Sequence, residues 1–165
     1  MFYYDMFKLH HLFSMLVAGP RGAGKTEFVK QLLTFKDFII TNSPERIVWF
    51  YGRYQPELFQ CLCQEIPAIE FHEGLPSNIE SVFNRSQKNL CVIDDLMQNA
   101  SSNQMIENLF TNGRHLNLSV VFITQNLFYQ GKNCRTISLN STYIVVFKNP
   151  KDQCGREGGG YFLHT

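Results

Sequence analysis

The stretch Gly19-Pro20-Arg21-Gly22-Ala23-Gly24-Lys25-Thr26 decides the fold class, because it has the spacing of a phosphate-binding P-loop, or Walker A motif. An apolar run precedes it and a segment of helical spacing follows it, which is the strand, loop and helix order that the motif requires. Glycines let backbone N–H groups turn inward around phosphate oxygens, and the following helix adds its N-terminal dipole. The alternative is a glycine-rich turn that matches the pattern by chance.

We expect this loop to bind ATP and Mg²⁺. Lys25 would reach the β- and γ-phosphates, and the Thr26 hydroxyl would coordinate the metal. Arg21 is expected to face solvent. The predicted nucleotide-binding residues are Gly19, Pro20, Arg21, Gly22, Ala23, Gly24, Lys25, Thr26 and Glu27.

Apolar runs bounded by turn residues alternate with segments of helical spacing along the chain, which predicts a three-layer α/β fold with a central, mostly parallel sheet. We expect one P-loop ATPase domain over residues 1–152, followed by a glycine-rich, flexible or truncated tail over 153–165. Ser77 and Glu80 predict a capping box for the third helix. The predicted strands are Phe13 to Ala18, Arg46 to Tyr51, Ile69 to His72, Leu90 to Ile93, Leu118 to Thr124 and Thr142 to Phe147. The predicted helices are Lys25 to Phe35, Pro56 to Glu65, Ile79 to Arg85 and Asn103 to Thr111.

The composition of the chain bears on its partners and on its cellular compartment. The 165 residues carry a net charge of +1, which gives no argument of its own for a nucleic-acid or membrane partner. The five cysteines are odd in number, no signal peptide precedes them, and no apolar run reaches the length of a membrane span. We expect an intracellular protein that is not secreted. Cys61 and Cys63 lack zinc-site spacing, and a solvated or capping role is expected for His10 and His11.

Two carboxylates follow the apolar run Leu90 to Ile93, and ligands of open α/β sheets bind at the carboxyl ends of strands. This is the pattern of a Walker B motif, in which Asp94 would hold Mg²⁺ and Asp95 would orient or deprotonate the attacking water. Asp95 stands where many such ATPases have a glutamate. A simple turn is the alternative interpretation.

The run Leu118 to Thr124 ends in an uncharged polar side chain, Gln125, which can bridge a γ-phosphate and the attacking water without adding charge. A turn with hydrogen-bonding side chains is an equal alternative. An arginine from a neighbouring subunit often completes such sites, and Arg114 and Arg135 are the candidates; a solvated surface position is the alternative for each.

Residues 12 to 152 resemble the poxvirus-type DNA-packaging ATPases of large DNA viruses and virus-like (Polinton/Maverick-type) transposons, in the FtsK–HerA branch of P-loop ATPases. The resemblance implies that Lys25 and Thr26 bind nucleotide and magnesium, that Asp94 and Asp95 form the Walker B pair, and that Gln125 is the polar sensor. Beyond the P-loop and Walker B motif it lies in Asn117-Leu118-Ser119, Thr124-Gln125-Asn126, Thr136-Ile137-Ser138-Leu139-Asn140-Ser141 and Phe147-Lys148-Asn149-Pro150.

The family implies a homo-oligomeric ring that hydrolyses ATP, translocates double-stranded DNA and contacts capsid or portal proteins. Two features depart from the family: His115-Leu116 stands where relatives often carry an arginine or a further histidine, and the tail turns glycine-rich where relatives continue with helical sequence. Two other functions stay open. One is a small nucleoside or nucleotide kinase, although the chain has no arginine-rich lid segment; the other is a truncated remnant that binds nucleotide without turnover.

Overall fold

The computed structural model describes residues 8–96, 100–125, 132–148 and 161–164, so that Asn126, Asn149 and Pro150 of the segments above lie outside the described residues. A seven-stranded sheet runs through the centre in the order β5-β4-β6-β7-β2-β8-β9. Its first six strands are parallel, and β9 is antiparallel to β8. The strands are β2 (Ser14–Ala18), β4 (Arg46–Tyr51), β5 (Glu70–Glu73), β6 (Asn89–Asp94), β7 (Leu118–Thr124), β8 (Tyr143–Val146) and β9 (Tyr161–His164).

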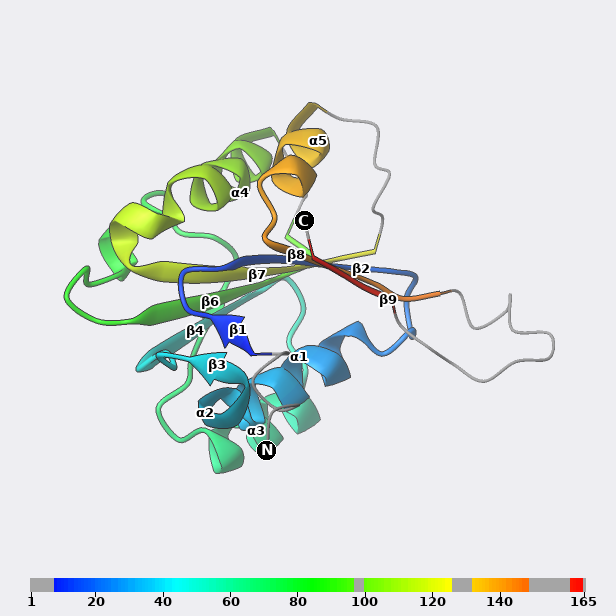
Figure 1. Ribbon diagram of the computed structural model, residues 1–165. Coiled ribbons are helices and arrows are strands. Elements are labelled where there is room, and N and C mark those ends of the chain that lie inside the picture. The colour runs from blue at the N-terminus through cyan, green and yellow to red at the C-terminus, as the bar shows by residue number, and fades with distance from the viewer. Residues whose placement is uncertain (1–7, 97–99, 126–131, 149–160, 165) are drawn as a thin grey trace.

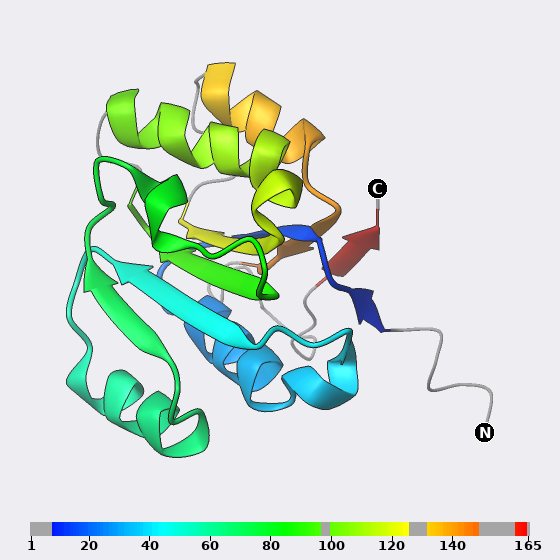
Figure 2. The same cartoon turned by 90° about the vertical axis from the view of Figure 1, so that its left-hand side faces the viewer.

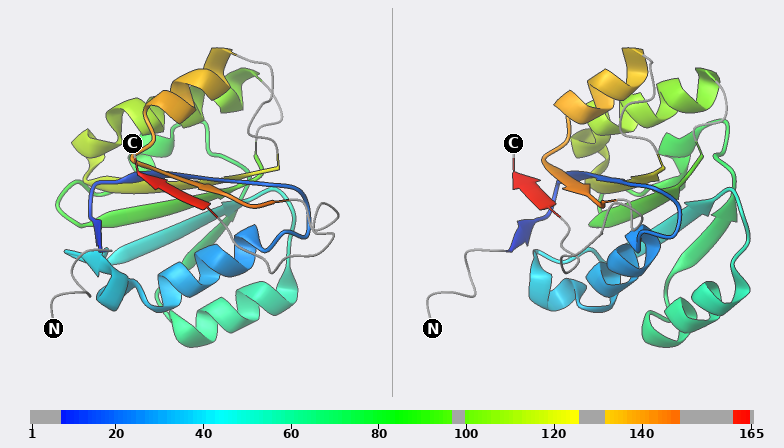
Figure 3. Two further views of the ribbon diagram at one scale, coloured as in Figure 1. Left: turned by 45° about the vertical axis from the view of Figure 1, so that its right-hand side comes forward. Right: turned by 90° about the vertical axis from the view of Figure 1, so that its right-hand side faces the viewer.

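Helices cover both faces of the sheet, as Figures 1 and 2 show. One face carries α1 (Lys25–Thr34), α2 (Lys36–Ile39) and α3 (Pro56–Glu65). The other carries α4 (Ala100–Asn112) and α5 (Lys132–Leu139). Figure 3 also shows β9 at the outer edge of the sheet beside β8. The three-layer α/β fold predicted from the sequence is therefore confirmed.

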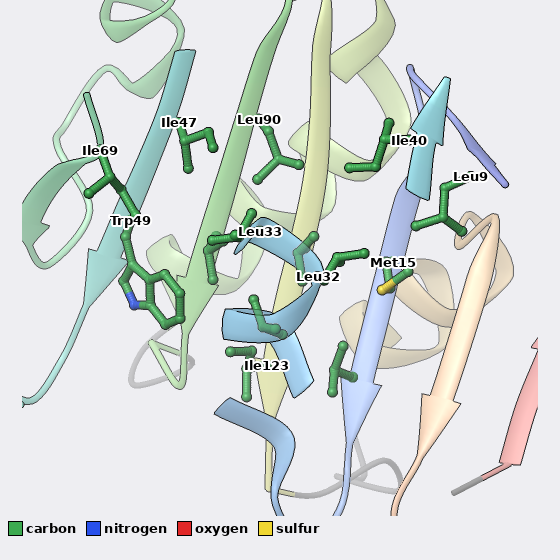
Figure 4. Close-up of a cluster of buried hydrophobic side chains, with 14 of the residues drawn as sticks. Leu9, Met15, Leu32, Leu33, Ile40, Ile47, Trp49, Ile69, Leu90 and Ile123 are labelled. Atoms are coloured by element: carbon green, nitrogen blue, oxygen red, sulfur yellow. The ribbon is translucent and has the colours of Figure 1, made fainter. Parts of the chain in front are cut away.

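Two clusters of buried hydrophobic side chains fill the space between the sheet and the helices on its two faces. Leu32 and Leu33 of α1 pack with Met15, Trp49 and Ile123 on one face (Figure 4), and Ile106, Leu109 and Phe110 of α4 pack in the cluster on the other. All seven residues of β7 are buried, as expected of a central parallel strand covered on both sides. None of the helices that the structure describes has the length and apolar character that a membrane span requires.

The predicted elements differ from the observed ones mainly where the apolar pattern is short. The third predicted helix is only a 3-10 turn, η2 (Ile79–Val82), and the expected capping box is absent because its N-cap is Asn78 and no side chain caps it. Several short elements were not predicted: α2, α5, a second 3-10 turn η3 (Gly113–Leu116) and the small parallel pair β1 (Leu9–His10) and β3 (Ile40–Thr41). Within the tail expected from residue 153, the described residues form β9.

Hydrogen bonds from the Asn117-Leu118-Ser119 segment connect the start of β7 to the residues just before β2. The Ser119 hydroxyl oxygen accepts the backbone N–H groups of Leu12 (3.0 Å) and Phe13 (3.2 Å), so its own proton is free for His11 Nδ1 at 2.9 Å. The other ring nitrogen of His11 then donates to Asn117 Oδ1 at 3.2 Å. His10 is exposed as expected, but the solvated or capping role expected for His11 is wrong.

Candidate nucleotide-binding site

The predicted P-loop connects β2 to α1 and needs glycine at two points. A Cβ atom on Gly19 would lie 2.8 Å from Phe147 Cβ and 2.9 Å from the Phe147 carbonyl oxygen, because the end of β8 passes directly behind the loop. Gly24, the N-cap of α1, has a φ of 98°, which side chains disfavour. Since no side chain caps α1, its first N–H groups remain available to an anion.

Lys25 begins α1 and points back into the loop. Its Nζ donates to the carbonyl oxygens of Gly19 (2.6 Å) and Pro20 (2.8 Å). Burial lowers the pKa of Lys25, and the negative charges of Asp95 and Asp94 oppose that change. The ammonium group is thus held at the loop and keeps one N–H for a further acceptor.

The acidic strand end brings Asp94 and Asp95 to the same edge of the sheet. Asp94 is the last residue of β6, whereas Asp95 has a φ of 52° and donates its backbone N–H to the Ile123 carbonyl at 3.0 Å. Burial first, and then the charge of Asp95, raises the pKa of Asp94 to about 6, against the opposing effect of Lys25. The environments of the two carboxylates therefore differ.

Each carboxylate accepts a hydrogen bond from a glutamine. Gln55 Nε2 donates to Asp94 Oδ2 at 3.3 Å, and Gln125 Nε2 donates to Asp95 Oδ2 at 2.7 Å. Gln125 follows β7 directly, and the sequence placed it at this edge. Gln55 is the N-cap residue of α3, and the sequence did not single it out.

A cleft of ≈ 610 Å³ joins these groups. The P-loop and α1 contribute Arg21, Gly22, Lys25 and Thr26. The strand ends contribute Asp94, Asp95, Ile123, Thr124 and Gln125, and the loop after β4 together with the start of α3 contributes Gly52, Arg53, Tyr54, Gln55 and Pro56. The pieces predicted separately from the sequence therefore face one another across a single opening.

The loop Gly52 to Gln55 is the wall that sequence reasoning missed. Arg53 is exposed, brings a positive charge into the cleft, and no hydrogen bond or ion pair of its side chain is found within the described residues. Tyr54 stacks at an angle on Tyr51 and meets Phe59 edge-on, with ring centroids 6.0 and 5.3 Å apart. This wall could have been predicted, because the loop follows the carboxyl end of a correctly predicted strand, where ligands of parallel sheets bind.

The oxygen donors of the cleft fit Mg²⁺, which commonly binds one or two protein oxygens together with phosphate and water. Thr26 and Asp94 line the cleft, and the described part of the chain has no group of three histidine, cysteine, aspartate or glutamate residues that would indicate a closed metal cage. We therefore retain Thr26 and Asp94 as the predicted ligands.

Not every predicted residue lines the cleft: Gly19, Pro20, Ala23 and Gly24 belong to the P-loop without lining it, and Glu27 and the two candidate arginines lie elsewhere. The Glu27 carboxylate accepts a hydrogen bond from Gln31 at 3.0 Å on the exposed side of α1, so it does not line the opening. Arg114 lies in η3, before β7, and the seven residues of β7 place it about 20 Å from the carboxyl edge of the sheet. It therefore does not line the cleft of its own chain, and neither does Arg135, which is exposed on α5.

Comparisons with known proteins agree with this architecture. The family model of the Poxvirus A32 protein matches residues 72–153, which include the acidic strand end, β7 and β8 but not the P-loop. A KaiC-like protein from Pyrococcus horikoshii OT3 has a TM-score of 0.62 at 14% identity, over 92% of this chain and 77% of that one. A comparison with curated protein sequences finds no significant match.

Two structures of EccC from Thermomonospora curvata share the fold as well, each with a TM-score of 0.59 at 13% identity over 92% of this chain. One contains ATPases 2 and 3 with a signal sequence peptide; the other is the cytoplasmic domain of this Type VII secretion ATPase. The chain spans 34% and 22% of them. The fold and the family match support an ATPase, and the chain resembles the poxvirus A32 family over residues 72–153.

Proposed function

We propose that this chain is an ATP-hydrolysing motor that translocates double-stranded DNA and packages a viral or transposon genome into a capsid. The observation that carries the proposal is the single cleft onto which Lys25, Thr26, Asp94, Asp95 and Gln125 all open. A phosphate-binding loop alone implies only binding. Carboxylates and a polar amide facing that loop supply what hydrolysis of the bound triphosphate needs.

In the proposed reaction the P-loop holds the phosphates and the Lys25 ammonium stabilises negative charge on them. Bound Mg²⁺ would neutralise charge on the phosphate oxygens, with Thr26 and Asp94 as its protein ligands. Asp95 and Gln125 would bind and orient the attacking water molecule. Because the Gln125 amide nitrogen already donates to one oxygen of Asp95, its carbonyl oxygen and the second Asp95 oxygen both remain to accept protons from one water molecule. That arrangement would orient the water and let Asp95 take its proton.

The motor part of the proposal rests on the family resemblance. We propose a homo-oligomeric ring, in which an arginine of one subunit reaches the cleft of its neighbour. Because Arg114 lies at the far edge of the sheet, it would have to act in the cleft of a neighbouring subunit and not in that of its own chain. Double-stranded DNA and capsid or portal proteins would be the partners, at a site of virion assembly in the host cell.

The decisive experiment measures ATP turnover with and without duplex DNA while the oligomeric mass is followed. We expect DNA to stimulate turnover in the assembled form. Lys25→Ala should abolish turnover, whereas Lys30→Ala, on the same helix but outside the cleft, should not. ATP hydrolysis that neither DNA nor assembly changes would refute the motor, and binding without turnover would favour the remnant. Phosphoryl transfer to nucleosides or their monophosphates would instead indicate a kinase.

A further inference from the structure

Trp49 is the only tryptophan of the chain and is completely buried in the middle of β4. Its indole Nε1–H is also buried and has no hydrogen-bond partner within the described residues. An indole nitrogen is a donor only, and buried donors are nearly always paired. The position of this group therefore calls for an explanation beyond apolar packing.

The strand register directs Trp49 toward Asp94. Trp49 pairs with Val92 of β6, and Tyr51, two residues on, pairs with Asp94. Trp49 and Asp94 thus point to the same face of the sheet as diagonal neighbours, a separation that a long aromatic side chain spans. Figure 4 shows the indole extending toward the carboxyl ends of the strands. The Trp49 N–H opposes the rise in the pKa of Asp94, because it stabilises the charged carboxylate.

Gln55 approaches the same carboxylate from the cleft. Its Nε2 donates to Asp94 Oδ2 at 3.3 Å. The indole N–H and the Gln55 amide belong to different elements, the first to the interior of β4 and the second to the position just before α3. The aromatic ring of Phe59 in α3 meets the Trp49 indole edge-on, at 6.5 Å between centroids, and so links the two elements.

We infer that Trp49 and Gln55 are positioning residues for Asp94, which fix the direction of its carboxylate toward the cation of the bound nucleotide. The inference rests on the proposed function. A carboxylate that binds a metal is oriented by hydrogen-bond donors around it that do not touch the metal themselves. Loss of such a donor typically weakens metal affinity or activity about 10- to 100-fold. One donor comes from the dry interior and the other from the cleft, so the carboxylate keeps a single orientation.

Trp49 supplies a readout that does not depend on turnover. We expect its intrinsic fluorescence to change when Mg²⁺ and ADP are added together, and to change much less when ADP is added with EDTA. In Asp94→Asn the metal-dependent part of the change should disappear. Because the chain has one tryptophan, the signal needs no assignment.

Variants separate positioning from packing. Trp49→Phe keeps a ring but removes the N–H, and Gln55→Leu removes the amide donor without disturbing the core. Both should raise the Mg²⁺ concentration for half-maximal ATP turnover about 10-fold. Phe71→Leu is the matched control, since Phe71 packs on both Trp49 and Phe59 but lies on β5, which β4 separates from β6.

Equal Mg²⁺ dependence of wild type and Gln55→Leu, together with a fluorescence response that Asp94→Asn retains, would overturn the inference. A shift of the same size in Phe71→Leu would also overturn it, because packing would then explain the effect. A different result would refute the proposed function without deciding the positioning inference. If wild type binds Mg²⁺ and ADP but does not hydrolyse ATP, the motor is refuted while the fluorescence experiment still decides on the positioning pair.

Discussion

Replacing Ser119 by alanine should destabilise the protein strongly although Ser119 lies at the opposite edge of the sheet from the cleft. The hydroxyl oxygen accepts two backbone N–H groups, and its proton is directed to His11 Nδ1. In Ser119→Ala the buried Phe13 N–H is left unpaired, at about 1–3 kcal/mol, and the part-buried Leu12 N–H and the histidine bond each lose about 0.5–1 kcal/mol. We expect a loss of about 3 kcal/mol, a large fraction of the roughly 5–15 kcal/mol of a typical domain.

Urea unfolding followed by circular dichroism would measure this loss. His11→Ala, which leaves both backbone bonds to Ser119 in place, should lose only about 1 kcal/mol. Ser14→Ala is the matched control. The Ser14 hydroxyl donates to the exposed Asn140 carbonyl, and the Thr142 N–H that it accepts also bonds to the Ser14 carbonyl oxygen, so this variant should change stability by less than about 1 kcal/mol. A loss in Ser119→Ala no greater than that in Ser14→Ala would refute the hydrogen-bond reasoning.

Three further predictions concern other parts of the molecule. Gly19→Ala should destabilise the fold by about 1–3 kcal/mol in urea unfolding, since its Cβ atom would lie 2.8 Å from Phe147 Cβ; an unchanged midpoint would contradict the close approach. Arg53→Ala should weaken ATP binding about fivefold in a direct binding titration, whereas Arg85→Ala, exposed in the loop before β6, should leave it unchanged. Burial chiefly lowers the pKa of His11 from 6.5, so the folded state favours the neutral ring; unfolding free energy should therefore fall as pH drops below 6.5, more steeply in wild type than in His11→Ala.

Much of the site was predictable because parallel strands end at the same edge of a sheet. The glycine spacing predicted the P-loop, and apolar runs ending in Asp94 and Gln125 predicted two more strand ends there. The register then brings them together: Ala18 pairs with Thr124, and Asp94 pairs with Ile123. No strand order was needed for this step, only the parallel direction.

The missed residues depend on pairings that the sequence does not contain. Trp49 reads as one apolar residue within a buried strand, and its relation to Asp94 appears only when β4 is placed beside β6. Gln55 reads as a residue before a helix with proline at its first turn. The failed capping box at Ser77 has a local cause, because the Ser81 hydroxyl donates to the Asn78 carbonyl and a short 3-10 turn forms in place of a helix.

The two adjacent carboxylates illustrate how a backbone turn creates the site. Consecutive residues of a strand point to opposite faces, so a straight continuation of β6 would send Asp95 toward the α4 face and away from the P-loop. The left-handed φ of 52° at Asp95 ends the strand at once, and aspartate accepts this conformation more readily than most residues. Asp94 therefore stays half-buried beside Gln55, while Asp95 turns to the exposed edge beside Gln125, and both line one cleft. Because the surroundings of the two carboxylates differ in this way, we propose different roles for them, metal binding for Asp94 and activation of the water for Asp95.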